Sequence, residues 1–138
     1  MFGEFWVSLP VKDVIKTSRF YGSLGFQPDF EHGGEDIGVK FVAGNQGTVV
    51  WFYAEKVFEN FARSGVVNAK QSAEVLLSIY VESKERVDEI ASQVFDAGGT
   101  VFGEPGWAFE WLYGCGIADL DGHRWAVLYK DESKMPQS

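Results

Sequence analysis

Apolar and polar positions along the chain form strand-like runs and helix-like stripes, in the same order twice. In the first half, the apolar run "FWVSLPV" (5–11) predicts a strand, and the stretch after it predicts an amphipathic helix. Asp13 is placed to cap this helix and Gly25 to end it. One face of the helix is expected to carry Val14, Ser18, Tyr21 and Leu24. The beginning of the chain therefore predicts a strand followed by a helix.

Two further apolar runs complete the first half. "IGVKFVA" (37–43) and "TVVWFYA" (48–54) are separated by "GNQG", whose composition is typical of a hairpin turn. A further strand is expected between residues 26 and 31, before a Gly-rich polar loop. The first half thus predicts the element order βαβββ.

The second half repeats this order. "EVLLSIYV" (74–81) predicts a strand, and Ser83 is placed to cap a helix. Three strand candidates follow, in "TVFGEP" (100–105), "EWLYGCGIA" (110–118) and "RWAVLYK" (124–130), the last two joined by the turn "DLDG". The apolar stripe of the helix is expected to consist of Val87, Ile90, Ala91 and Val94.

The repeat predicts an α+β fold with two βαβββ modules. The predicted parts are a first module at 1–55, a linker with a short helix at 56–73, a second module at 74–132 and a mobile tail at 133–138. Each helix covers one face of its sheet, so the open faces of two curled mixed sheets are expected to enclose a cleft.

Composition narrows the functional classes. The net charge of −8 opposes binding to nucleic acid or to an anionic membrane surface. No apolar run is long enough to span a bilayer, and the first residues do not resemble a signal peptide. The single cysteine, Cys115, fits a reducing compartment, so we expect a cytoplasmic protein. An aromatic content of 16% indicates either a large aromatic core or an aromatic-lined cavity.

Three segments resemble one known superfamily. "VSLPVKDVIKTSRFYGSLGF" is similar to the opening motif of the vicinal oxygen chelate superfamily, which includes glyoxalase I, bleomycin resistance proteins and extradiol dioxygenases. "DLDGHRWAVLY" is similar to its closing motif, and "AEVLLSIYVESKERVDEI" extends the similarity over almost the whole chain. The segments most resemble the predicted lactoylglutathione-lyase-like branch. The resemblance implies paired βαβββ modules, often in a homodimer.

The resemblance also implies where a divalent metal would be bound. The enzymes of the superfamily commonly hold it with His and Glu side chains from both modules. The four matching positions in this chain are Trp6, Trp51, Leu76 and Ala126. Indole nitrogen is only a donor, and the other side chains lack a lone pair for a metal. We therefore expect no metal or other cofactor at the family positions.

A rearranged metal site is the alternative, with a glyoxalase-like lyase or dioxygenase activity. Its candidate ligands are His32, His123, Glu110 and Cys115. Three of them also have a structural interpretation: His32 as a solvated loop residue, His123 as part of the turn, and Cys115 as a core thiol. The sequence contains no motif of a nucleophile elbow or of a phosphate-binding loop.

Strand alternation predicts which side chains line the cleft. Aromatic rings there would stack on a planar or cationic group, as in bleomycin resistance proteins that sequester a drug without chemistry. The chain is therefore interpreted as a metal-free protein that binds a small organic ligand. In the competing interpretation, Trp6 and Trp51 only fill the cleft. The expected ligand-binding residues are Trp6, Ser8, Trp51, Tyr53, Leu76, Ser78, Tyr80, Arg124 and Ala126, together with Glu110, Trp111 and Tyr113 from the stretch 107–118, whose cleft-facing side alternation leaves open.

Overall fold

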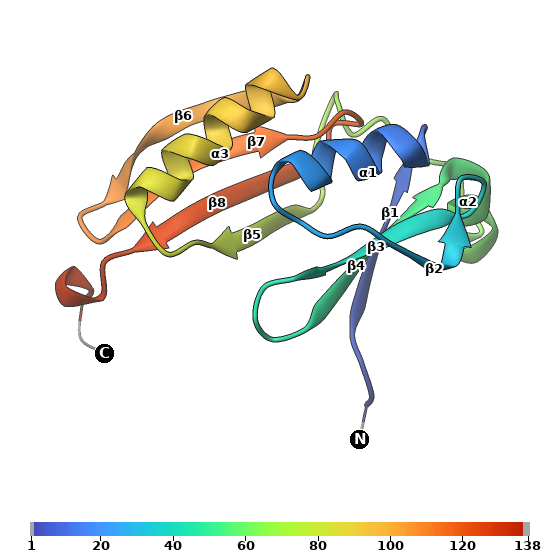
Figure 1. The fold of residues 1–138 in the computed structure, drawn as a ribbon, viewed down its shortest axis with the longest axis horizontal. Coiled ribbons are helices and arrows are strands. Elements are labelled where there is room, and N and C mark those ends of the chain that lie inside the picture. The colour runs from blue at the N-terminus through green and yellow to red at the C-terminus, as the bar shows by residue number, and fades with distance from the viewer. Residues whose placement is uncertain (1, 137–138) are drawn as a thin grey trace. The chain divides into compact units, whose positions relative to one another are not determined.

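The computed structural model describes residues 2–136 and divides the chain into two compact units, 1–68 and 69–138. Each unit contains one four-stranded mixed sheet, and each has the order βαβββ (Figure 1). This confirms the predicted α+β fold class. The boundary between the units follows Asn68.

The first unit has the strand order β1-β4-β3-β2, in which β1 is parallel to β4 and the other pairs are antiparallel. Helix α1 packs on β3 and β4, and α2 contacts β1 and β4 (Figure 1). The elements are β1 (Trp6–Val11), α1 (Val14–Ser23), β2 (Asp29–Gly34), β3 (Gly38–Ala43), β4 (Thr48–Ala54) and α2 (Glu55–Ala62).

The second unit has the equivalent order β5-β8-β7-β6, with β5 parallel to β8. Helix α3 packs on β6, β7 and β8 (Figure 1). The elements are β5 (Leu76–Tyr80), α3 (Lys84–Asp96), β6 (Thr100–Phe109), β7 (Leu112–Ala118), β8 (Arg124–Lys130) and the 3-10 helix η1 (Glu132–Lys134).

The two covering helices form as the sequence predicts. Asp13 accepts a hydrogen bond from the backbone N–H of Lys16 (3.0 Å) and caps α1. Tyr21 on α1 is buried and stacks on Phe52 of β4, with the ring centroids 4.6 Å apart. All four residues of the predicted α1 face and all four of the predicted α3 stripe are buried.

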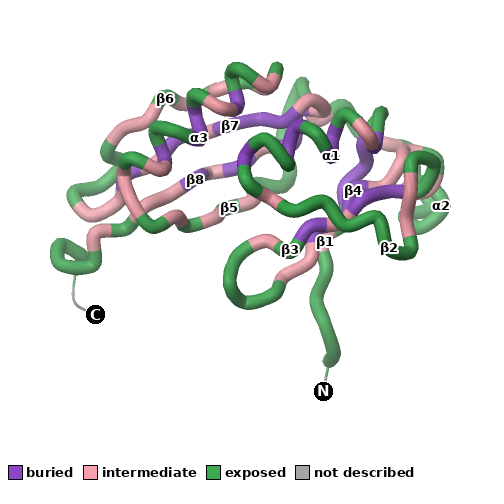
Figure 2. The backbone as a smooth tube through the Cα atoms, in the orientation of Figure 1, coloured by how far each residue is buried: buried purple, intermediate pink, exposed green. Residues whose placement is uncertain are grey.

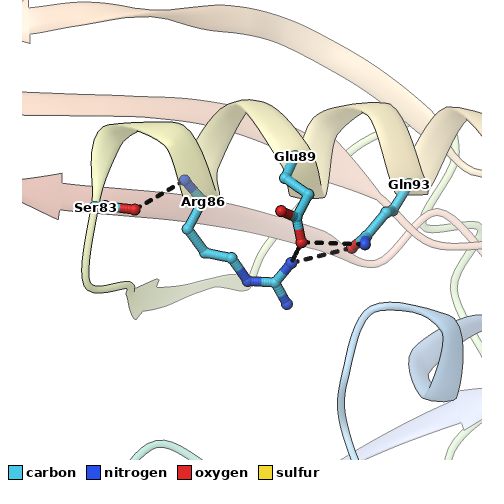
Figure 3. Close-up of polar contacts among 4 residues, drawn as sticks. All are labelled: Ser83, Arg86, Glu89 and Gln93. Atoms are coloured by element: carbon cyan, nitrogen blue, oxygen red, sulfur yellow. Dashed lines mark hydrogen bonds and ion pairs between the residues drawn. The ribbon is translucent and has the colours of Figure 1, made fainter.

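The N-terminal part of α3 is held by polar side chains (Figure 3). The Ser83 hydroxyl accepts a hydrogen bond from the backbone N–H of Arg86 (3.1 Å), which confirms the predicted cap. The Arg86 guanidinium pairs with Glu89 and also donates to Gln93 (3.3 Å). Arg86, Glu89 and Gln93 lie on one side of the helix, next to its buried stripe.

Several observed elements differ from the predicted ranges at their ends. The edge strand β2 begins at Asp29 and extends to Gly34, beyond the predicted 26–31. Strand β6 continues past residue 105 to Phe109, and its register against β7 shifts in several places. Of the predicted tail, residues 133–134 belong to η1, and 137–138 lie outside the described residues.

Burial follows the two-residue period of the strands. Along β7 and β8 buried positions alternate with more exposed ones (Figure 2), since only one face of the sheet is covered by α3. Within residues 2–136, none of the helices is long and apolar enough to cross a membrane.

Candidate functional site

The face of the first sheet opposite α1 carries a set of aromatic side chains. Val50 and Phe52 of β4 are buried on the side of α1, so strand alternation places Trp51 and Tyr53 on the other side. The strand register puts Ser8 of β1 and Lys40 of β3 on either side of Trp51. We call this surface the aromatic face; it consists of Trp6, Ser8, Lys40, Trp51 and Tyr53.

Trp51 lies at the centre of the aromatic face. Its ring is parallel to that of Tyr53 within 6°, with the centroids 5.0 Å apart, and Trp6 lies 6.2 Å away at a tilt of 46°. The Lys40 ammonium stands 5.3 Å from the Trp51 ring centroid, within cation–π distance. Phe61 of α2 extends the array through its contact with Tyr53 (5.4 Å).

Burial within the array is uneven. Trp51 is only 3% exposed, whereas Trp6 is 46% exposed. The indole Nε1 of Trp51 is buried and has no hydrogen-bond acceptor among residues 2–136. Burial also raises the pKa of the Tyr53 phenol above its usual value. The aromatic face therefore combines an accessible ring with a buried, unpaired donor.

The uncovered face of the second sheet is built differently. Leu76, Ser78 and Tyr80 of β5 lie opposite Arg124, Ala126 and Leu128 of β8. Gly116 of β7 is next to Ala126, and the ring of Phe102 from β6 lies over that glycine. Arg124 stands 4.3 Å from the Phe102 ring centroid, and Lys130 stands 4.8 Å from that of Tyr80. We call this surface the second open face; it consists of Leu76, Ser78, Tyr80, Phe102, Gly116, Arg124, Ala126 and Leu128.

Tyr113 and Cys115 lie on the opposite, helix-covered face, so grouping Tyr113 with Ser78 and Ala126 was wrong. The Tyr113 hydroxyl donates a hydrogen bond to Asp88 of α3 (2.6 Å), and this bond, with burial, raises the pKa of Tyr113 to about 12. Cys115 is buried, and desolvation raises the pKa of its thiol to about 11. These two residues connect the sheet to α3.

Glu110 and Trp111 form the turn between β6 and β7 rather than a strand. Trp111 stacks on Phe109 at a ring separation of 5.7 Å, and its carbonyl accepts from the backbone N–H of Asp131 (2.7 Å). Their position at the end of the second sheet separates them from Ser78 and Ala126.

Solved structures with the same fold cover nearly the whole chain. The hypothetical protein SA1046 from S. aureus is 32% identical over 94% of this chain and 95% of its own, with a TM-score of 0.82. A glyoxalase/bleomycin resistance protein/dioxygenase family enzyme from Burkholderia phytofirmans PsJN is 20% identical, covers 91% and 97%, and has a TM-score of 0.76. A glyoxalase-related enzyme from Fulvimarina pelagi is 19% identical, covers 94% and 89%, and has a TM-score of 0.78.

The chain has the fold of solved structures from the glyoxalase/bleomycin resistance/dioxygenase superfamily. This is the fold that the resemblance in the sequence motifs implies. No family model and no curated protein matches the chain.

The superfamily's metal positions can now be placed in the structure. Trp6 and Trp51 lie together on the aromatic face, and Leu76 and Ala126 both lie on the second open face. Their side chains carry no atom that can donate a lone pair to a cation, so they do not fit the metal that the superfamily implies.

The candidate ligands of a rearranged site lie apart. His32 is exposed on β2 beside Glu31 (3.4 Å), in the first unit. In the second unit, Glu110 precedes β7 and His123 follows it, so they lie at opposite ends of that strand, and Cys115 faces α3. Over the described part of the chain, no three His, Cys, Asp or Glu side chains are grouped closely enough to hold a metal.

Several residues on or next to the open faces were missed by the sequence analysis. Lys40 and Phe102 belong to strands whose inner and outer faces were not assigned, and Phe61 belongs to the short helix α2. Alternation in "IGVKFVA" could have indicated Lys40 once Phe41 was taken as core. Phe102 had no comparable signal, because the register shifts of β6 are not visible in the sequence.

Proposed function

We propose that this protein is a metal-free small-molecule-binding member of the superfamily, and that its aromatic face holds a planar organic ligand. The observation that carries the proposal is the continuous array of Trp6, Trp51 and Tyr53, joined to Lys40 and Ser8 on one sheet face. Flat aromatic surfaces stack on planar groups, and nearby polar atoms orient them.

The expected affinity follows from the number of rings. Each aromatic contact contributes about 0.5–1.5 kcal/mol beyond the area that it buries. Micromolar binding needs roughly 8 kcal/mol in total, which includes apolar burial and polar contacts. Two or three rings with one hydrogen bond are therefore sufficient for micromolar capture. We also expect the protein to be a homodimer and to be located in the cytoplasm.

Trp6→Ala tests this proposal. Because Trp6 is half-exposed, its removal should lower the stability only modestly, whereas the loss of one stacking ring should weaken ligand binding about tenfold. Quenching of tryptophan fluorescence in a screen of planar compounds measures binding, and thermal denaturation measures stability. Trp107→Ala is the matched control, since Trp107 is also half-exposed but lies on β6 of the second unit. A Trp6→Ala protein that binds as tightly as the parent would contradict the proposal.

The alternative, a glyoxalase-like lyase or dioxygenase with a rearranged metal site, is tested by metal content. The protein, purified without chelator, is incubated with zinc, nickel, manganese or iron and then freed of loose metal. We expect far less than one equivalent per chain, because the side chains at the four family positions have no lone pair for a cation, and no three His, Cys, Asp or Glu side chains are grouped among the described residues. One tightly held equivalent would overturn the metal-free proposal and favour the enzyme.

A further inference from the structure

The indole N–H of Trp51 is a buried donor that has no acceptor among the described residues, 2–136. Trp51 is 97% buried, and its Nε1 meets no acceptor within residues 2–136. Indole nitrogen can donate one hydrogen bond and accepts none. Buried polar groups are nearly always paired, so an unpaired one at the centre of a candidate site requires an explanation. The group that would satisfy it is an acceptor oxygen or nitrogen.

The Lys40 ammonium adds a positive charge over the same ring. It stands 5.3 Å from the Trp51 ring centroid, and the Lys40 side chain is only 20% exposed. Its acidic partner is Asp29, 4.0 Å away and about half-exposed. An ion pair of this length and exposure contributes little. Trp51 therefore has a donor at its edge and a weakly compensated cation above its face.

The Trp51 N–H and the Lys40 ammonium favour an anionic ligand over a cationic one. A cationic ligand would need the ring position that Lys40 holds, and the ammonium would repel it. The net charge of −8 does attract cations at long range, but salt screens this attraction within about 10 Å. At contact distance, the local donor and ammonium determine the preference.

We propose that the ligand of the aromatic face is a planar anion, whose carboxylate or similar acidic oxygen accepts from Trp51 Nε1 and pairs with Lys40. This rests on the proposed function and adds the charge of the ligand to it. The hydrogen bond and the ion pair would together fix the orientation of the stacked ring system. The half-exposed Trp6 is the neighbouring ring on the aromatic face, 6.2 Å from the Trp51 ring.

Three naphthalene probes test the inference; their substituent at position 2 is anionic, neutral or cationic. They are 2-naphthoate, neutral 2-naphthalenemethanol and 2-naphthylmethylammonium, each titrated calorimetrically into the full chain. We expect naphthoate to bind at least tenfold more tightly than the ammonium compound, with the neutral alcohol between them. If none of the three binds, the proposed function fails together with the inference. If the ammonium compound binds as tightly as naphthoate or more so, the inference is overturned and the proposed function stands.

Two variants test whether the preference for naphthoate depends on Lys40 and Trp51. Lys40→Met removes the charge and keeps the length of the side chain, and Trp51→Phe removes the N–H and keeps an aromatic ring. Each should lower naphthoate affinity about fivefold to tenfold and change the affinity for the alcohol much less. Lys84→Met is the matched control, because Lys84 also stands over a ring, that of Tyr113 (5.0 Å), on the helix-covered face of the second unit.

Folding is checked separately from binding. Circular dichroism and thermal denaturation of each variant identify any loss of structure, and Lys40→Met remains informative if Trp51→Phe does not fold. A naphthoate preference that is unchanged in folded Lys40→Met and Trp51→Phe would overturn the inference. The same loss in Lys84→Met would also overturn it, because the effect would then not depend on the aromatic face.

Discussion

The sheet faces that lie opposite α1 and α3 have the same backbone pairing, but their large side chains come from different strands. In the first unit, the row across the sheet is Ser8, Trp51 and Lys40. The equivalent row in the second unit is Ser78, Ala126 and Gly116. The central strand supplies the large ring in the first sheet, whereas the edge strand β6 supplies Phe102 in the second.

This difference shows how an internal repeat can diverge while its register is kept. A glycine on β7 leaves space for a ring that comes from the neighbouring strand, and each ring has a cationic side chain above it. Only the first arrangement leaves a buried, unpaired donor among the described residues. The proposed ligand binding therefore concerns the first face, and we expect Phe102 to have mainly a packing role.

The largest expected effect is the removal of the central ring. Trp51→Ala should lower the free energy of unfolding by roughly 3–5 kcal/mol, because a nearly fully buried indole is replaced by a cavity. Trp107→Ala should cost much less, since Trp107 is half-exposed. Urea denaturation measures both. Equal losses for the two variants would show that Trp51 is not the packing centre of its face.

The next effect concerns the glycine of the second face. A Cβ on Gly116 would clash with the Phe102 ring, so Gly116→Ala should cost about 1–3 kcal/mol. Phe102→Ala removes the ring that causes the clash. In the double variant the glycine substitution should cost much less, and a double-mutant cycle measures this coupling. Strictly additive losses would contradict the proposed contact.

The covered faces also differ, and Tyr113 tests this difference. Tyr21 in the first unit stacks on Phe52, whereas Tyr113 in the second donates to the Asp88 carboxylate. Tyr113→Phe should lower the free energy of unfolding by about 1–3 kcal/mol, since it removes a hydrogen bond to a charged group. Urea denaturation at neutral pH measures this loss, and an unchanged midpoint would contradict it.

Alkaline pH gives an independent measurement of the same bond. The pKa of Tyr113 is raised from 10.0 to about 12 in the folded state, so its contribution is complete below pH 10 and is lost as the pH rises through 12. Between these values the parent should lose stability more steeply than Tyr113→Phe. Parallel stability profiles for the two proteins would show that Tyr113 does not titrate in this way.

Cys115 is expected to have the smallest effect on stability, so its burial is better tested by the reactivity of its thiol. Burial raises the pKa of its thiol from 9.0 to about 11, so very little thiolate is present at pH 8. A thiol-specific disulfide reagent should react with the folded protein at least tenfold more slowly than with the urea-unfolded chain. Fast reaction in the native state would contradict the buried position against α3.

Much of this fold could be predicted because both helices and the central strands have clear periodicity. The face of Trp6, Ser8 and Trp51 followed from alternation alone, and the register of β1 against β4 places these residues on one face. The residues of the superfamily's metal positions could be named from the motifs. Their mutual arrangement needed the structure.

Other features depended on register, which the sequence does not specify. Tyr113 was grouped with the open face, but Gly114 and Gly116 occupy that side of β7, and Tyr113 points to α3. A displacement by one residue exchanges the two faces of a strand, and the irregular β6–β7 pair provides no simple period for choosing between them. The contact between Lys40 and Trp51 required the β3–β4 register for the same reason.

The parallel pairs also constrain the order of folding. Trp6 of β1 pairs with Val49 of β4, and Leu76 of β5 pairs with Arg124 of β8, so each pair joins the first strand of a unit to its last. Closing so long a loop has an entropic cost that neighbouring hairpins do not have. During synthesis, β1 leaves the ribosome first and has no partner in its sheet until β4 has followed. Each sheet is therefore complete only when its first-synthesised strand, β1 or β5, has paired with its last, β4 or β8.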